Sequence, residues 1–351
     1  MTIIAVESAP GESRAAAFDE DAQAYAFFCW RDPRIDPRAR VGDVYEARVT
    51  KIDRGMRGCF LELSTGEIAY CQQRSGDRPP AEGARLNVRI QSEGWADKST
   101  RVSVVTDPPF RASKEDAFKS WRANLPLGAS AEIIEDTREA GELIDEAYDE
   151  AMNEVVTMDS GGQIIIQATR ALTSVDVDSF GRIIRGGTQE INLEAVETLA
   201  RQVSLRQIGG IVVADLIGAV SGNLATDLVK RFRKSLKRYD RRGANILPIN
   251  RLGLFEFSLP RQRRPLTCDE FERLSETEKL NEDMLEILRE LNRALQSNRS
   301  ATVEVRLDPR TYSSLQRCSL DWKTELAAQY GGRFKITQDD SLDESGYEVI
   351  V

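Results

Sequence analysis

The chain has 351 residues, of which 41% are hydrophobic and 30% are charged, and its formal net charge is −9. This length suits two or three domains, and the composition excludes a disordered, collagen-like or disulfide-rich protein. No histidine is present, so every mechanism that needs a histidine base or a histidine metal ligand is excluded. The five cysteines form no C-x-x-C pair, which argues against a zinc site and indicates a reducing environment.

The N-terminus has no basic region before its short apolar run, so we expect no signal peptide. No segment approaches the roughly 18 consecutive apolar residues that a membrane span needs. We therefore expect a cytoplasmic protein.

The first 107 residues read as short strands. Strands are predicted at 3–6 and 25–30, around an acidic turn, and a turn-rich connector follows at 31–38. About five alternating strands follow within 39–107, and their number and spacing are typical of a small barrel of the OB type.

Two aromatic residues fall on the polar face of this barrel. Phe60 and Tyr70 lie on strands that a short turn makes neighbours. Such aromatics hold unpaired bases at about 1–3 kcal/mol each, or they cover an adjoining domain. Lys98 and Arg101 follow, and they either meet phosphates or are simply solvated.

The rest of the chain alternates helices and strands, which favours an α/β region followed by a small α+β unit. Helices are predicted at 112–125, 138–153, 192–206, 223–239, 279–295 and near 313–330. Strands are predicted at 163–167, 172–178, 208–215, 246–249, 252–257, 301–307, 333–337 and 347–351.

Charge is unevenly distributed along this second half. Residues 230–264 carry a net charge of +10, whereas residues 269–351 carry −7. Lys230, Arg233 and Lys237 fall on the outward face of the predicted helix 223–239. This face either grips a phosphate backbone or is an ordinary solvated helix surface.

Three aspartates mark the strand ends of the α/β region. Asp176 and Asp178 share one face of a strand, and Asp215 ends the next buried strand. At the carboxyl edge of an α/β sheet these carboxylates would converge, and without histidine they favour Mg²⁺ or Mn²⁺. The alternative is that Asp178 caps a turn and Asp215 is merely exposed.

Several long motifs around these aspartates resemble the catalytic core of the ribonuclease E/G family. They occur in the family's order, at 171–179, 185–187, 192–195, 205–215 and 251–256. The resemblance implies an RNase H-like subdomain at 1–38 and 108–168 with an OB-fold barrel inserted at 39–107. A DNase I-like catalytic subdomain at 169–264 and a small domain at 265–351 would follow.

By this resemblance, Asp176 and Asp215 match the family's two metal-binding aspartates. Asp178 stands where the family has an asparagine that positions the metal or the phosphate. Phe60 and Tyr70 match the two RNA-stacking aromatics of the barrel, and Lys98 matches a basic RNA contact.

The chain also departs from the family pattern in three ways. Asp178 adds negative charge beside the metal. Only Cys268 lies near the family's Cys-Pro-x-Cys link, so no zinc is expected and a homo-oligomer would not form through a zinc link. Too few residues separate Val105 from Leu125 to hold the domain that senses a 5′-monophosphate.

We therefore expect a Mg²⁺-dependent endoribonuclease that cleaves single-stranded RNA through a metal-activated water, in RNA processing or decay. It would not sense a 5′-monophosphate. The alternative is a non-catalytic RNA-binding protein or regulator on a decayed scaffold of this family. A third hypothesis makes the apolar stripe of helix 279–295 a docking or oligomer surface, unless that stripe is core.

Overall fold

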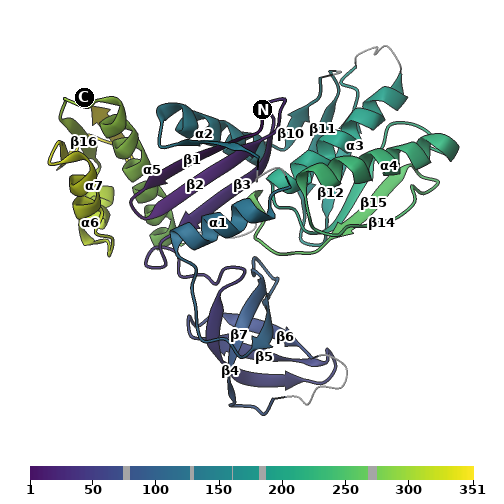
Figure 1. Ribbon diagram of the computed structural model, residues 1–351, viewed down its shortest axis with the longest axis horizontal. Helices are drawn as coiled ribbons and strands as arrows, with labels where there is room; N and C mark the ends of the chain where they lie inside the picture. The colour runs from purple at the N-terminus through teal and green to yellow at the C-terminus, as the bar shows by residue number, and fades with distance from the viewer. Residues whose placement is uncertain (74–79, 127–129, 160, 182–186, 268–274) are drawn as a thin grey trace.

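A computed structural model describes residues 1–73, 80–126, 130–159, 161–181, 187–267 and 275–351. The described chain forms three open sheets and one closed barrel. The barrel stands apart below the other three parts, which lie in a row (Figure 1). No helix in these ranges is long and apolar enough to cross a membrane.

The first sheet joins the start of the chain to a strand more than 100 residues later. Its strands, in the order β3-β2-β1-β9, are β1 (Ile3–Ala9), β2 (Glu12–Phe18), β3 (Ala24–Arg31) and β9 (Glu132–Glu135). Helix α1 (Lys114–Asn124) packs through Trp121 on one face, and helix α2 (Arg138–Met152) packs through Ile144 on the other. The predicted acidic turn before the strand at 25–30 is present at residues 19–23, but the buried strand Glu12–Phe18 that precedes it was not predicted.

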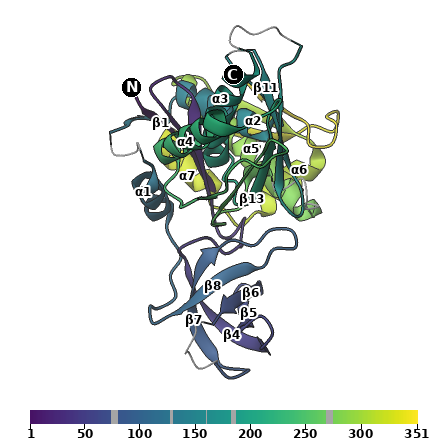
Figure 2. The same ribbon diagram turned by 90° about the vertical axis from the view of Figure 1, so that its right-hand side faces the viewer.

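The barrel is inserted between β3 and α1. Its strands are β4 (Val44–Asp53), β5 (Gly58–Leu63), β6 (Ile68–Gln72), β7 (Arg85–Ser92) and β8 (Thr100–Val105), and they close in the order β4-β5-β6-β8-β7. Alternate residues such as Cys59, Leu61 and Leu63 fill its core. The predicted OB-like barrel is confirmed, and Figure 2 shows it from the side.

The second sheet has six strands, in the order β10-β11-β12-β13-β15-β14. They are β10 (Val155–Thr157), β11 (Gln163–Ala168), β12 (Thr173–Asp178), β13 (Gly210–Asp215), β14 (Asn245–Ile246) and β15 (Leu254–Leu259). Helices α3 (Thr188–Leu205) and α4 (Gly222–Tyr239) cover the face formed by residues such as Val175, Val212 and Phe255. The other face has no helix of the described chain packed on it.

This sheet corrects one predicted boundary. Strand β10 pairs with β11, and β11 pairs with β12, so both β10 and β11 belong to the second sheet. The predicted division between 108–168 and 169–264 therefore cuts through a hydrogen-bonded sheet. The change from one part to the next falls instead between α2 and β10.

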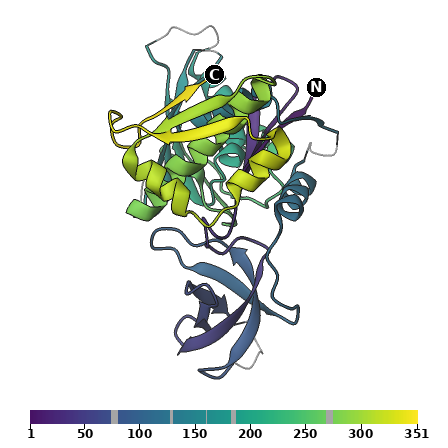
Figure 3. The ribbon, with the colours of Figure 1, turned by 90° about the vertical axis from the view of Figure 1, so that its left-hand side faces the viewer.

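The C-terminal part of the chain combines helices with a three-stranded sheet (Figure 3). It contains α5 (Glu276–Ser297), β16 (Val303–Leu307), α6 (Pro309–Arg317), α7 (Trp322–Tyr330), β17 (Phe334–Gln338) and β18 (Tyr347–Ile350). The single helix predicted near 313–330 is two helices. The apolar stripe of α5, including Met284, Leu288 and Leu291, is fully buried in this domain's core. The hypothesis that this stripe is a docking surface is therefore wrong.

An ionic joint fixes α5 against the first sheet. The Glu12 carboxylate is almost fully buried and lies 2.8 Å from Arg31 Nε, while Arg289 of α5 contacts it from the other side. Burial alone would raise the pKa of Glu12, but Arg289, Arg31 and Arg14 hold it down at about 2. The small domain is thus held by buried charge as well as by apolar contact.

Candidate functional site

Two aspartates lie directly opposite each other on neighbouring strands of the second sheet. Strands β12 and β13 are parallel, and their register pairs Asp176 with Asp215. Paired strands lie about 4.8 Å apart, and both residues alternate with buried neighbours such as Val175 and Ala214. The two carboxylates therefore project side by side from the uncovered face, at the carboxyl ends of their strands.

Asp178 lies on the same face but plays a different structural part. It is two residues beyond Asp176, so it is not opposite Asp215, and its partner on β11 is Gln163. Its Oδ1 accepts a hydrogen bond from the backbone N–H of Phe180 at 3.0 Å. Asp178 therefore caps the turn that ends β12, which was the structural alternative considered for it.

The number of carboxylates that lie together decides which metal ions this site could hold. Within the described ranges, no group of three or more Asp, Glu, Cys or His side chains could hold one. The expected convergence of three carboxylates therefore does not occur in this arrangement. However, Mg²⁺ typically takes only one or two carboxylates and completes its shell with waters and substrate phosphate. The pair Asp176 and Asp215 fits that donor set.

Two exposed apolar side chains lie in turns at the ends of strands β12 and β15 of the same sheet. Phe180 is 63% exposed and has a φ of +52°, a left-handed conformation that is rare for a bulky residue. Leu252 is 81% exposed, in the turn just before β15, where Leu254 pairs with Asp215. Neither residue was predicted from the sequence, although an aromatic residue directly after the aspartate motif was a visible signal.

The barrel carries a row of four side chains across four strands. The register pairs Lys51 with Phe60, Phe60 with Tyr70, and Tyr70 with Arg101. The two rings are half-buried with centroids 5.4 Å apart, and both cations are exposed. The structure thus brings together the predicted aromatics and places a cation at each end. Lys51 was not predicted, because the pairing of β4 with β5 is not visible in the sequence.

The Tyr70 ring is held in place by its surroundings. Its hydroxyl donates a hydrogen bond to the Met56 carbonyl oxygen at 2.7 Å. A Cβ at Gly58 would overlap that hydroxyl, so glycine is needed there. Burial and the nearby Asp53 raise the pKa of Tyr70, and the hydroxyl therefore remains a donor at neutral pH.

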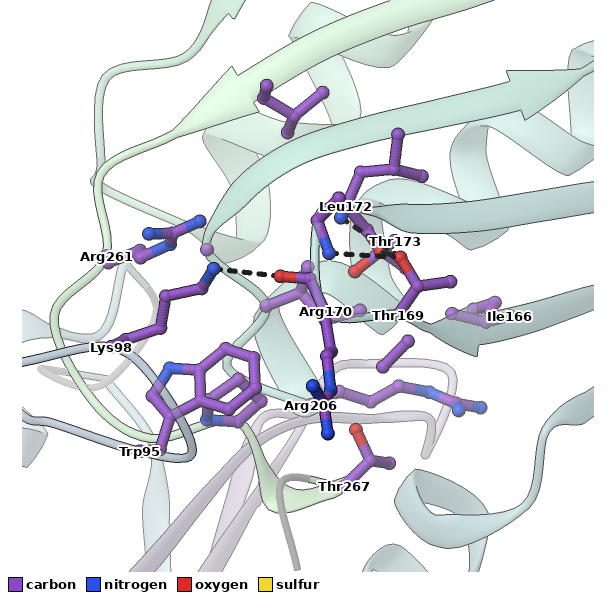
Figure 4. A pocket seen from close by; sticks show the side chains of 16 residues that line it. Trp95, Lys98, Ile166, Thr169, Arg170, Leu172, Thr173, Arg206, Arg261 and Thr267 are labelled. Atoms are coloured by element: carbon purple, nitrogen blue, oxygen red, sulfur yellow. Dashed lines mark hydrogen bonds between the residues drawn. The ribbon is translucent and has the colours of Figure 1, made fainter. Parts of the chain in front are cut away.

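Lys98 lies at the joint between the barrel and the second sheet (Figure 4). Its Nζ donates to the Arg170 carbonyl oxygen at 2.8 Å and lies 3.6 Å from the Asp97 carboxylate. Trp95 and Arg261 line the same small pocket. In this structure Lys98 therefore docks the barrel on the sheet and does not join the row around Phe60 and Tyr70.

The basic residues of α4 lie away from the aspartates. Lys230, Arg233 and Lys237 are exposed, while Leu228, Phe232 and Leu236 of the same helix face the sheet. Since α4 covers the apolar face, the three cations lie on the opposite side of the sheet from Asp176 and Asp215. Lys230 also lies 3.9 Å from Asp227. The structure does not bring this basic surface together with the carboxylate pair.

Comparison with known proteins gives a consistent match for the region that contains the aspartates. Residues 128–264 match the model of the ribonuclease E/G family. Ribonuclease E of Escherichia coli (strain K12) is 38% identical over 125 residues, which cover 34% of this chain and 11% of that protein. Ribonuclease E of Synechocystis is 29% identical over 187 residues, covering 51% of this chain and 27% of that protein.

A ribonuclease G is also similar to this chain, over part of the length of each protein. Ribonuclease G of Haemophilus influenzae is 28% identical over 134 residues, covering 36% of this chain and 27% of that protein. This chain therefore spans about a tenth to a quarter of the length of these relatives. A solved multidomain protein with nucleic acid binding domains from Streptococcus pneumoniae aligns over 43% of the chain, with 12% identity and a TM-score of 0.18.

Proposed function

We propose that this protein is an endoribonuclease acting on single-stranded RNA in the cytoplasm, because residues 128–264 match the model of the ribonuclease E/G family. The observation that carries the proposal is the register of β12 and β13, which sets Asp176 opposite Asp215 on the open face of the sheet. The proposed DNase I-like catalytic subdomain is this sheet with α3 and α4. The RNase H-like subdomain is the first sheet with α1 and α2.

Asp176 and Asp215 would hold one Mg²⁺, or Mn²⁺ in its place. When bound, the ion would supply positive charge against the scissile phosphate and lower the pKa of a water. Asp178 keeps the end of β12 in shape through its turn and adds negative charge near the pair. Phe180 and Leu252 offer apolar surface to the bases on either side of the cut.

The barrel would bind unpaired RNA upstream or downstream of the cut. In the row Lys51, Phe60, Tyr70 and Arg101, the rings stack with bases and the flanking cations meet phosphates. Lys98 would add positive charge for RNA binding where the barrel meets the second sheet. On the far side of the sheet, Lys230, Arg233 and Lys237 would attract the RNA backbone away from the reacting phosphate.

The short connection from barrel to α1 supports entry without recognition of a 5′-monophosphate. Strand β8 ends at Val105 and α1 begins at Lys114, so no domain intervenes. We therefore expect internal cuts in RNA that begins with a 5′-hydroxyl.

An end-labelled, A/U-rich single strand with a 5′-hydroxyl tests this function. Internal cuts should require Mg²⁺, stop in EDTA, and be lost in Asp176→Asn. Ser174→Ala is the matched control, because Ser174 lies on the same face of β12, two residues before Asp176. Cleavage that survives Asp176→Asn combined with Asp215→Asn would show that the site is assigned wrongly.

A second function is a non-catalytic RNA-binding protein or regulator on the same scaffold. It is favoured by the turn-capping role of Asp178 and by the lack of a third metal ligand within the described ranges. RNA binding that persists in EDTA, with no cut at any Mg²⁺ or Mn²⁺ concentration, would establish it.

A further inference from the structure

A concave surface lies outside the proposed catalytic site. It is a cleft of about 590 Å³ between the first sheet, the segment that enters the barrel, and α5. Ligand sites in proteins typically have volumes of 300–1,000 Å³. None of the residues in the proposed catalytic site lines this cleft, so it needs a separate explanation. We refer to it as the arginine cleft.

The arginine cleft has an excess of positive charge. Nine arginines and six carboxylates line it, and no lysine does. Some of the guanidinium groups share a single acid. Arg38 Nε lies 2.7 Å from Asp36, and Arg40 contacts the other oxygen of the same carboxylate. Arg38 and Arg40 thus share the single negative charge of Asp36 at this end of the cleft.

Arg263 forms no ion pair within 4 Å with any carboxylate of the residues that the structure describes. Its guanidinium is half-buried and lies over the Phe28 ring, 6.0 Å from the ring centroid. Burial lowers the pKa of Arg263, and the neighbouring Arg40 lowers it further, whereas Glu93 raises it. An arginine held beside another arginine without a carboxylate in contact is the arrangement that a bound anion would stabilise.

The nearest carboxylate is already engaged elsewhere. Glu93 is buried, and its two oxygens accept hydrogen bonds from the backbone N–H groups of Val41, at 3.1 Å, and Arg264, at 3.0 Å. These bonds fix the start of the barrel against the segment that carries Arg263. Glu93 therefore shapes the cleft but does not form an ion pair with Arg263.

Aromatic side chains provide a flat apolar surface in the same cleft. Phe110 is 50% exposed, and Trp30 is half-buried with its Nε1 donating to the Ala112 carbonyl oxygen at 3.4 Å. Arginine forks suit phosphate groups, and exposed aromatic faces suit nucleobases. A simple inorganic anion would use the first feature and leave the second without a role.

From this combination we infer that the arginine cleft binds a nucleotide, with the phosphate on Arg263 and Arg40 and the base against Phe110 or Trp30. The ligand is either a free nucleoside monophosphate or a nucleotide of an RNA chain, since both present the same chemistry. This inference does not depend on the proposed nuclease activity, because no residue of the aspartate pair contributes to the cleft.

Calorimetric titration of the full chain in EDTA tests the inference without any cleavage. Uridine and adenosine monophosphates, uridine, inorganic phosphate and a short single-stranded RNA are the probes. The monophosphates should bind with one site per chain, and uridine at least about tenfold more weakly because it lacks the charged group. Arg263→Gln should weaken monophosphate binding by about tenfold or more.

Two further proteins make the result decisive. Arg138→Gln is the matched control, because Arg138 is an exposed arginine of α2 outside the cleft, and it should bind normally. Asp176→Asn should also bind normally, which separates this site from the proposed catalytic one. Thermal unfolding of each variant shows whether Arg263→Gln is folded, and Arg40→Gln replaces it if it is not.

The remaining outcomes divide clearly. RNA binding that weakens in Arg263→Gln, with no binding of free monophosphates, identifies the RNA chain as the source of the nucleotide. Inorganic phosphate binding as tightly as the monophosphates would overturn the role of the base. The absence of any binding that depends on Arg263 or Arg40 would overturn the site.

Discussion

The two faces of the second sheet differ in what their side chains do. On the covered face, Val175, Val212 and Phe255 are at most 3% exposed and pack against α3 and α4. On the open face, Asp176 and Asp215 alternate with them along the same strands. Strand alternation therefore places the residues that stabilise the core on one face and the residues of the proposed catalytic site on the other. Substitutions one position apart should separate the two properties.

The largest effect is expected at the open face. Asp176→Asn should reduce the rate of RNA cleavage at least about 10³-fold, about 4 kcal/mol of transition-state stabilisation, because it removes one of the two carboxylates proposed to hold the metal. Its free energy of unfolding should change by less than about 0.5 kcal/mol, because Asp176 is exposed. Single-turnover cleavage and urea unfolding measure the two quantities. A large loss of stability would contradict the separation of the faces.

Val175→Ala, one residue earlier on the covered face, should do the reverse. It removes two methyl groups from the core, which should lower the free energy of unfolding by about 2–3 kcal/mol. Cleavage per folded molecule should be unchanged at temperatures where the variant is fully folded. Urea unfolding followed by a cleavage assay checks this, and a catalytic defect in the folded variant would show that the faces are coupled.

Phe180→Ala should weaken binding of the RNA segment around the cut. Loss of one base–aromatic stack costs about 1–3 kcal/mol, so KM should rise about 5- to 150-fold while the unfolding free energy does not fall. Phe180 is 63% exposed, so its removal loses little buried surface. Leu252→Ala is the companion variant on the other side of the pair. An unchanged KM in both would leave the flanking surface without a role in binding.

The smallest effect is expected on the far side of the sheet. Replacing Lys230, Arg233 and Lys237 together by glutamine should lower the salt dependence of RNA binding, by about 2 in the slope of log K against log salt. The cleavage rate of bound RNA should not change, because these residues lie on the outer surface of α4, on the opposite side of the sheet from Asp176 and Asp215. Binding measured at several salt concentrations tests this, and an unaltered slope would make the α4 surface an ordinary solvated face.

The local elements were readable from the sequence because their periodicity was strong. The alternation in β12 and the apolar stripe of α4 predicted both elements and their buried faces. Strand β2 was missed because its Glu12 and Arg14 are buried through ion pairs with distant residues, which leaves no alternation to detect.

The site was predictable in its residues but not in its arrangement. Asp176, Asp215, Phe60 and Tyr70 stand out by type and position. That Asp176 and Asp215 are exact partners depends on strand register, which is set by tertiary packing. Likewise, the basic stripe of α4 was visible, but the side of the sheet that it occupies was not. In the sequence, Arg263 is one of many basic residues in the segment 230–264. Only the structure shows that it lines the arginine cleft without an ion-pair partner among the described residues.

The insertion of the barrel has a consequence for how the chain folds. Strand β9 pairs with β1 across about 130 residues of sequence, and the entire barrel lies between them. Closing so long a loop is entropically costly and slows folding, whereas the barrel is built from nearer contacts. During synthesis the barrel can therefore form before β9 pairs with the edge of β1. The first sheet would therefore form after the barrel. Until β9 pairs with β1, the open edge of β1 would be the part of the nascent chain most exposed to misassembly.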